Sequence, residues 1–174
     1  MKSLTRWCIV GFIVTVLLGS LLHFLYDWTG ESIFVAPFSA VNESTWEHMK
    51  LFFIPSFLFA LIQNFAMKDV HDNFWIIKLI SLTLGTILIP ILFYTYNGAF
   101  GKSPDWLNIL FFILSTSTSY VVEFLLFRQK NTCKFCAWYF IILCAIAFTF
   151  VIFTFFPPKL PLFQDPITKL YGAI

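Results

Sequence analysis

The sequence predicts an all-α membrane protein, a bundle of five transmembrane helices. The 174-residue chain is 59% hydrophobic and only 11% charged, whereas soluble domains are about 45–50% apolar and about 25% charged. Apolar runs of the length that crosses the hydrocarbon core, about 20 residues, alternate with short polar segments. Because these runs leave no room for a separate soluble domain, we predict a single membrane domain over residues 1–174.

The expected helices cover about 6–26, 45–67, 74–94, 106–127 and 136–156. The first follows Lys2 and Arg6 and continues through aromatic residues without a small-residue cleavage motif, so we interpret it as an uncleaved anchor. The second begins at a capping motif, and short polar segments precede the third, fourth and fifth. The pair Pro157-Pro158 ends the fifth, because proline cannot continue a helix.

Orientation is predicted from lysine and arginine, which are enriched in cytoplasmic loops. An N-terminus inside places the larger share at the cytoplasmic ends: Lys2, Arg6, Lys68, Lys78, Arg128, Lys130 and Lys134. The outer ends then hold Lys50, Lys102, Lys159 and Lys169. We therefore expect a multi-pass protein of the cell membrane with its C-terminal tail, 157–174, outside. The halves show no sequence repeat, so an inverted-repeat transporter is not supported.

One polar stretch, Asn42-Glu-Ser-Thr-Trp-Glu-His-Met-Lys50, interrupts this apolar chain. Ser44 and Glu47 fit a capping box, in which the Ser44 hydroxyl accepts from the Glu47 N–H and the Glu47 carboxylate accepts from the Ser44 N–H. Trp46 suits the membrane interface. Lys50 can extend outward or pair with Glu47. These residues therefore have structural roles without any ligand.

Glu43 and His48 are less well explained by helix capping. His23, near the outer end of the first helix, is expected at the same membrane depth. Two histidines and two or three carboxylates at one membrane level could bind a divalent metal or form an acid/base pair, although no H-E-x-x-H spacing is present. A satisfied structural or ligand-binding network remains the alternative. Convergence of His23, His48 and a carboxylate within about 4–5 Å around a gap would keep the metal hypothesis.

The candidate residues form three overlapping sets. The possible metal ligands are His23, Glu43 and His48, and the possible catalytic residues are Glu43 and His48. The ligand-binding set is His23, Asp27, Trp28, Asn42, Glu43, Glu47, His48, Lys50 and Asp165.

Two features lie toward the predicted cytoplasmic face. Glu123 is an intramembrane acid, and such residues are functional candidates, but we expect it to pair with Arg128 or Lys134. Cys133-Lys-Phe-Cys136 is a C-x-x-C pair with too few ligands for a structural zinc, so reduced thiols are the expected state. The hydroxyl-rich run 115–120 is expected to serve helix packing, with Gln63 and Asn64 as possible partners.

Three motifs together are similar to a known family. They are His23-Phe-Leu-Tyr-Asp-Trp28, the stretch Asn42–Lys50, and Pro157-Pro-x-x-Pro-Leu-Phe-x-Asp-Pro166. They resemble an uncharacterised family of small bacterial multi-pass membrane proteins, a domain of unknown function. The resemblance covers nearly the whole chain and implies location and topology, but no activity.

Three functions follow as hypotheses. The first is an outward-facing polar pocket, partly covered by the tail, that binds a small molecule, a lipid headgroup or a protein partner. The second is a membrane-embedded hydrolase, metal-assisted or acid/base, that uses Glu43, Glu47, His48 and His23. The third is a proton-coupled carrier that uses Glu123. The lipid bilayer is the expected partner, an oligomer is allowed, and the net charge of +2 gives no support for nucleic acid.

Overall fold

The computed structural model describes residues 2–67, 73–129 and 136–173. These residues form α1 (Lys2–Trp28), α2 (Thr45–Ala66), α3 (Phe74–Phe100), α4 (Asp105–Phe127), α5 (Cys136–Phe155) and a short 3₁₀ helix, η1 (Pro161–Phe163). Five of these helices are long and apolar enough to cross a membrane. The described residues contain no named strand. The predicted five-helix membrane bundle is therefore confirmed.

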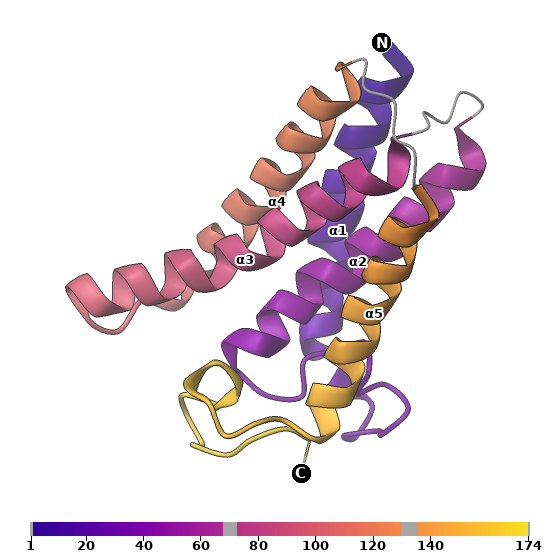
Figure 1. The fold of residues 1–174 in the computed structure, drawn as a ribbon. Helices are drawn as coiled ribbons and strands as arrows, with labels where there is room; N and C mark the ends of the chain where they lie inside the picture. Colours follow the sequence, from indigo (N-terminus) through magenta and orange to yellow (C-terminus); the bar gives the residue numbers. More distant parts are fainter. Residues whose placement is uncertain (1, 68–72, 130–135, 174) are drawn as a thin grey trace.

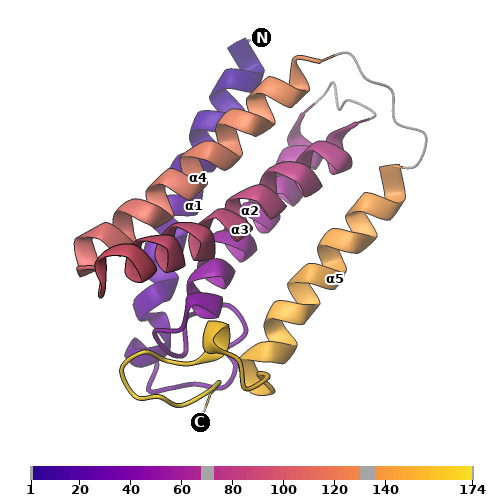
Figure 2. The same ribbon diagram turned by 60° about the vertical axis from the view of Figure 1, so that its left-hand side comes forward.

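Helix α2 occupies the centre of the bundle. It packs against α1, α3 and α5, while α4 packs against α1 and α3. Figure 2 shows α5 along the side formed by α2 and α3. The main apolar core gathers phenylalanines of α2 against α5, with Phe52, Phe53 and Phe150 fully enclosed. Figures 1 and 2 place the two chain ends at opposite ends of the bundle, as an odd number of spans requires.

Helix α3 is longer than the sequence predicts. We expected it to end near residue 94, with a loop over 95–105, but it continues to Phe100. The Asn97 side chain donates to the Phe93 carbonyl (2.7 Å), and the Asn97 backbone carbonyl accepts from the Gly101 N–H (3.1 Å). Gly101 has a positive φ of 85°, a conformation that favours glycine at a helix end. The stop signal is therefore Gly101 and not the polar residues before it.

The C-terminal segment folds back onto the start of α2. Phe163 of η1 is buried, and its ring lies 4.6 Å from the ring of Trp46, centroid to centroid. The Asn42 side chain donates to the Gly172 carbonyl (3.2 Å), and the Ala173 N–H donates to the Thr154 carbonyl (2.9 Å). The tail thus joins the polar stretch 42–50 and the end of α5 at one end of the bundle (Figure 1).

Candidate functional site

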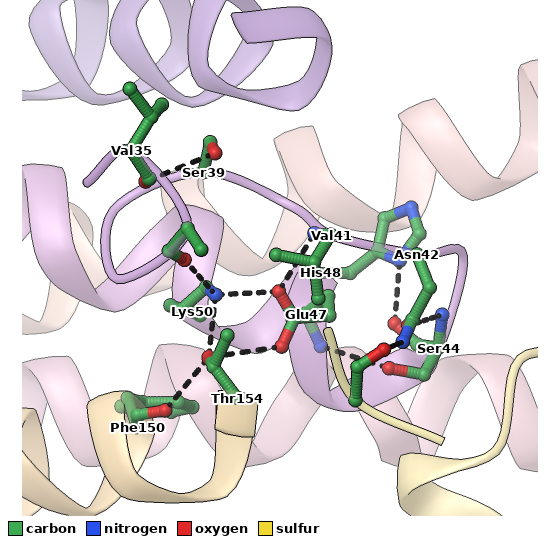
Figure 3. A network of polar contacts seen from close by, with 12 residues as sticks. Val35, Ser39, Val41, Asn42, Ser44, Glu47, His48, Lys50, Phe150 and Thr154 are labelled. Carbon is green, nitrogen blue, oxygen red and sulfur yellow. Dashed lines mark hydrogen bonds and ion pairs between the residues drawn. The ribbon is translucent and has the colours of Figure 1, made fainter. Parts of the chain in front are cut away.

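A buried ion pair organises the start of α2. The Lys50 ammonium lies 2.5 Å from Glu47 Oε2, and both side chains are almost completely buried. Lys50 also donates to Thr154 Oγ1 of α5 (2.7 Å) and to the Ala36 carbonyl (2.9 Å). Figure 3 shows these contacts converging on the ammonium group. We call Ala36, Val41, Glu47, Lys50 and Thr154 the Lys50 network.

Every charged atom of the Lys50 network has a partner. Glu47 Oε2 also accepts from the Val41 N–H (3.1 Å), and Glu47 Oε1 lies 3.3 Å from the Thr154 hydroxyl (Figure 3). A buried charge is tolerated only when it is paired and hydrogen-bonded. The network therefore joins α2, α5 and the segment before α2 through fully used polar groups. Both charged groups are thus engaged within the bundle, and ligand binding by Glu47 and Lys50 stays a prediction.

The capping prediction is half right. The Ser44 hydroxyl accepts from the Glu47 N–H (3.4 Å), as expected. The prediction that the Glu47 carboxylate returns to the Ser44 N–H is wrong, because that N–H donates to Asn42 Oδ1 (2.9 Å). Lys50 and Thr154 draw the Glu47 carboxylate into the bundle instead, and the local turn at Asn42 supplies the missing acceptor.

His23, Glu43 and His48 come together at the same end of the bundle. The Nε2 atoms of His23 and His48 each lie 3.6 Å from Glu43 Oε2. One ligand atom from each of the three residues lies within 4.8 Å of the other two. This convergence meets the 4–5 Å criterion set from the sequence. We call these three residues the His23–Glu43–His48 cluster.

A backbone contact fixes the ring of His48. Its Nδ1 lies 2.9 Å from the Ser44 carbonyl (Figure 3). A carbonyl only accepts, so Nδ1 of His48 carries a proton, and Nε2, the nitrogen nearer Glu43, is the one that could bind a metal ion. Metal-binding histidines are commonly oriented in this way, by donating their second nitrogen to a backbone carbonyl. The buried Nδ1 of His23 has no hydrogen-bond partner among the described residues.

Glu43 provides the negative charge of the cluster. Interaction with the His23 ring lowers the pKa of the Glu43 carboxyl below its ordinary value, against the opposing effect of partial burial, and His48 acts in the same direction. The Glu43 carboxylate is therefore ionised at neutral pH. Its side chain is 44% exposed, and the two histidines are 27% and 28% exposed. The cluster is thus reachable from outside the bundle.

The remaining predicted residues fall around these two centres. Asp27 and Trp28 are exposed at the end of α1, where Trp28 stacks on Phe24 with ring centroids 5.8 Å apart. Asn42 holds both Ser44 and the tail. Asp165 is buried, and its carboxylate accepts from the Ile167 N–H (2.7 Å) within the tail itself. Ligand binding by these residues stays a prediction.

A second buried ion pair lies deeper in the bundle. Glu123 Oε1 is 2.6 Å from Lys78 Nζ, and Gln63 bridges the pair by accepting from Lys78 (2.5 Å) and donating to Glu123 (3.3 Å). The prediction that Glu123 pairs with Arg128 is wrong, because Glu123 points into the bundle toward Lys78 of α3. The alternative partner that we predicted, Lys134, lies outside the described residues. Glu123 Oε2 is buried without a hydrogen-bond partner among the described residues.

Two partners were absent from the sequence prediction. Thr154 was read only as part of an apolar helix, and Lys78 only as a charge at the cytoplasmic end. Matching depths along antiparallel helices would have placed Thr154 opposite Lys50.

Since Lys50 and Lys78 are buried and paired, the orientation prediction depends on the other basic residues. The C-x-x-C prediction falls on residues 133–136; Cys133 lies outside the described part of the chain.

The comparisons with known proteins concern the whole chain. Searches of curated proteins and of solved structures returned no match. A family model described as "Family of unknown function (DUF6512)" matches residues 1–173. Because this match covers nearly the whole chain, the chain belongs to the family of unknown function DUF6512.

Proposed function

We propose that this membrane protein binds a divalent metal ion through His23, Glu43 and His48. The observation that carries the proposal is the convergence of their ligand atoms within 4.8 Å. The three residues come from α1, from the segment before α2, and from the first turn of α2. Donors from separate segments that meet at one point support a site and not a local turn.

The distances suit a small transition-metal ion. Zn²⁺ binds imidazole nitrogen and carboxylate oxygen at about 2.0–2.2 Å in tetrahedral geometry, so neighbouring donors lie about 3.3–3.6 Å apart. Both histidine nitrogens are 3.6 Å from Glu43 Oε2. The three ligand atoms lie within 4.8 Å of one another, so an ion bound to all three requires the two histidine side chains to approach each other by up to about 1.2 Å. Two imidazoles and one carboxylate also form a known donor set for zinc and for non-haem iron.

The surroundings support a preorganised site. The Ser44 carbonyl orients His48, and the Lys50 network fixes the first turn of α2, which carries His48. Asn42, the residue before Glu43, donates from its side chain to the Gly172 carbonyl of the tail. Ligands held by packing and outer hydrogen bonds bind metal more tightly than free ones.

The test is a metal-binding measurement on protein in nanodiscs, prepared metal-free. We expect one Zn²⁺ per chain by titration and elemental analysis. His48→Ala and Glu43→Gln should each weaken binding by more than about 100-fold, since even outer-sphere changes cost 10–100-fold. His71→Ala, which removes the third histidine of the chain, is the matched control and should keep wild-type affinity. Equal and negligible binding by all four proteins would overturn the proposal.

The other hypotheses are changed by the contacts. A polar pocket that binds a small molecule, headgroup or partner remains compatible with the exposed cluster, with the ion as its polar anchor. A hydrolase remains the second candidate, without Glu47, whose carboxylate is occupied by Lys50 and Thr154. The carrier hypothesis keeps Glu123 as its acid, now paired with Lys78. Unchanged transport of every tested substrate by Glu123→Gln would count against it.

A further inference from the structure

The His23–Glu43–His48 cluster supplies three donors, one fewer than a closed tetrahedral site. Among the described residues, no fourth ligand atom belongs to the group that converges within 4.8 Å. Structural zinc sites have four protein ligands, whereas sites with three keep a position for water or another exchangeable ligand. An ion in this cluster would therefore keep an open position.

The open position faces the outside of the bundle. The three side chains are 27%, 28% and 44% exposed, while Glu47 and Lys50 on the inner side are almost completely buried. The cluster lies at the end of one membrane-spanning helix, α1, and at the start of another, α2. A ligand in the open position would thus lie at the depth of the lipid headgroups.

Asp27 provides a polar group beside this position. It follows His23 by four residues, so both side chains project from one face of α1. The Asp27 charge is close enough to interact electrostatically with the His23 ring. Its carboxylate is not one of the ligand atoms that converge within 4.8 Å, which belong to His23, Glu43 and His48. This placement suits an acceptor of a hydrogen bond from a metal-bound ligand better than it suits a direct metal ligand.

Aromatic groups on the same helix border the cluster on the apolar side. The Phe24 ring lies 4.9 Å from the His23 ring, and Trp28 stacks on Phe24 at 5.8 Å. Phe24 is 50% exposed and Trp28 is 67% exposed. A polar ion site next to exposed rings on a membrane helix matches a molecule with a polar head and an apolar chain.

We propose that the ion keeps an exchangeable position that binds an oxygen donor on the headgroup of an amphiphile. Asp27 accepts a hydrogen bond from that donor group, and Phe24 contacts the start of the apolar chain. This inference rests on the proposed metal site and names the class of ligand that the site takes.

The test uses Co²⁺ in place of the native ion, because its visible absorption bands report changes in its ligands. The protein is loaded in nanodiscs and titrated with two hydroxamates that share one oxygen-donor head. Acetohydroxamate is soluble, and decanohydroxamate is an amphiphile. The proteins are wild type, Asp27→Asn, Phe24→Ala and Phe148→Ala, the last a matched change at an exposed phenylalanine of α5.

We expect both hydroxamates to shift the bands of the wild-type protein. Asp27→Asn should leave Co²⁺ affinity within about threefold and weaken both hydroxamates by about tenfold, the size of a lost charge-assisted hydrogen bond. Phe24→Ala should weaken decanohydroxamate about threefold more than acetohydroxamate, through lost apolar contact. Phe148→Ala should change neither, which separates contact at the site from partition into the lipid.

The outcomes distinguish the two proposals. Absence of bound Co²⁺ overturns the metal site itself. Bound Co²⁺ whose bands do not respond to either hydroxamate keeps the metal site and overturns the open position. Loss of Co²⁺ binding in Asp27→Asn would make Asp27 a ligand and the site closed. Equal effects of Phe24→Ala on the two hydroxamates would overturn the proposal that the ligand is an amphiphile and would indicate a soluble ligand.

Discussion

Glu43 and Glu47 are four residues apart and differ in almost every physical respect. Glu47 is buried, and its two oxygens are shared among Lys50, Thr154 and the Val41 N–H. Glu43 is 44% exposed, and its Oε2 lies 3.6 Å from the Nε2 atoms of two imidazoles. The two carboxylates therefore differ in how many of their acceptor positions are already occupied by hydrogen bonds and ion pairs within the protein. A carboxylate with every acceptor used holds a fold together, and one with acceptors to spare can take a ligand.

The largest effect is expected at Lys50. Replacing Lys50 by Met keeps the length of the side chain but leaves Glu47 as an uncompensated buried charge, which costs about 3–5 kcal/mol. Unfolding in mixed micelles with increasing SDS measures this loss. Lys102→Met, at an exposed lysine, is the control and should change stability little. A Lys50→Met protein as stable as wild type would mean that the pair contributes nothing to the fold.

The second effect concerns Thr154, the link from Glu47 to α5. Thr154→Val keeps the shape and removes the hydroxyl that contacts Lys50 and Glu47, so we expect a loss of about 1–3 kcal/mol by the same measurement. The matched control is Thr149→Val, because that hydroxyl donates to the Ala145 carbonyl within its own helix. Equal losses in the two variants would remove Thr154 from the network.

A smaller effect is expected at Ser44, which contacts the Glu47 backbone N–H and the His48 ring. Ser44→Ala removes the hydroxyl that caps Glu47 and keeps the backbone carbonyl that orients His48. We expect a loss of about 1 kcal/mol, typical of a helix N-cap, with metal affinity within a few-fold of wild type. A large loss of metal affinity at unchanged stability would show that the cluster depends on the cap more than on the carbonyl.

The smallest effect on stability is expected at Glu43. Glu43→Gln should change the free energy of unfolding by less than about 0.5 kcal/mol in metal-free protein, as for a partly exposed surface substitution. In the presence of Zn²⁺, wild type should gain stability by mass action and Glu43→Gln should not. Thermal melts with and without Zn²⁺ measure both quantities. A strong destabilisation of the metal-free variant would place Glu43 with Glu47 as a structural residue.

The positions of the helices could be predicted from the sequence, but few of the side-chain pairs between helices could. Length and hydropathy located each span within a few residues, except the end of α3, where glycine and not polarity stops the helix. The convergence of His23 with His48 followed from a match of depths. The partners of Glu47 and Glu123 did not follow, because Thr154 and Lys78 lie on other helices and rotation about the helix axis decides which residue faces inward. Local rules such as the capping box describe one helix end and cannot include such partners.

The spacing of Glu47 and Lys50 has a consequence for the assembly of the protein in the membrane. The two residues are three positions apart on α2, whereas Thr154 follows Glu47 by 107 residues. A helix that carries its own counter-ion is nearly neutral as a unit, with or without α5 beside it. The Thr154 hydroxyl adds to a charge pair that α2 closes by itself. The pair that holds the finished bundle together thus also lowers the cost of placing its central helix in the bilayer.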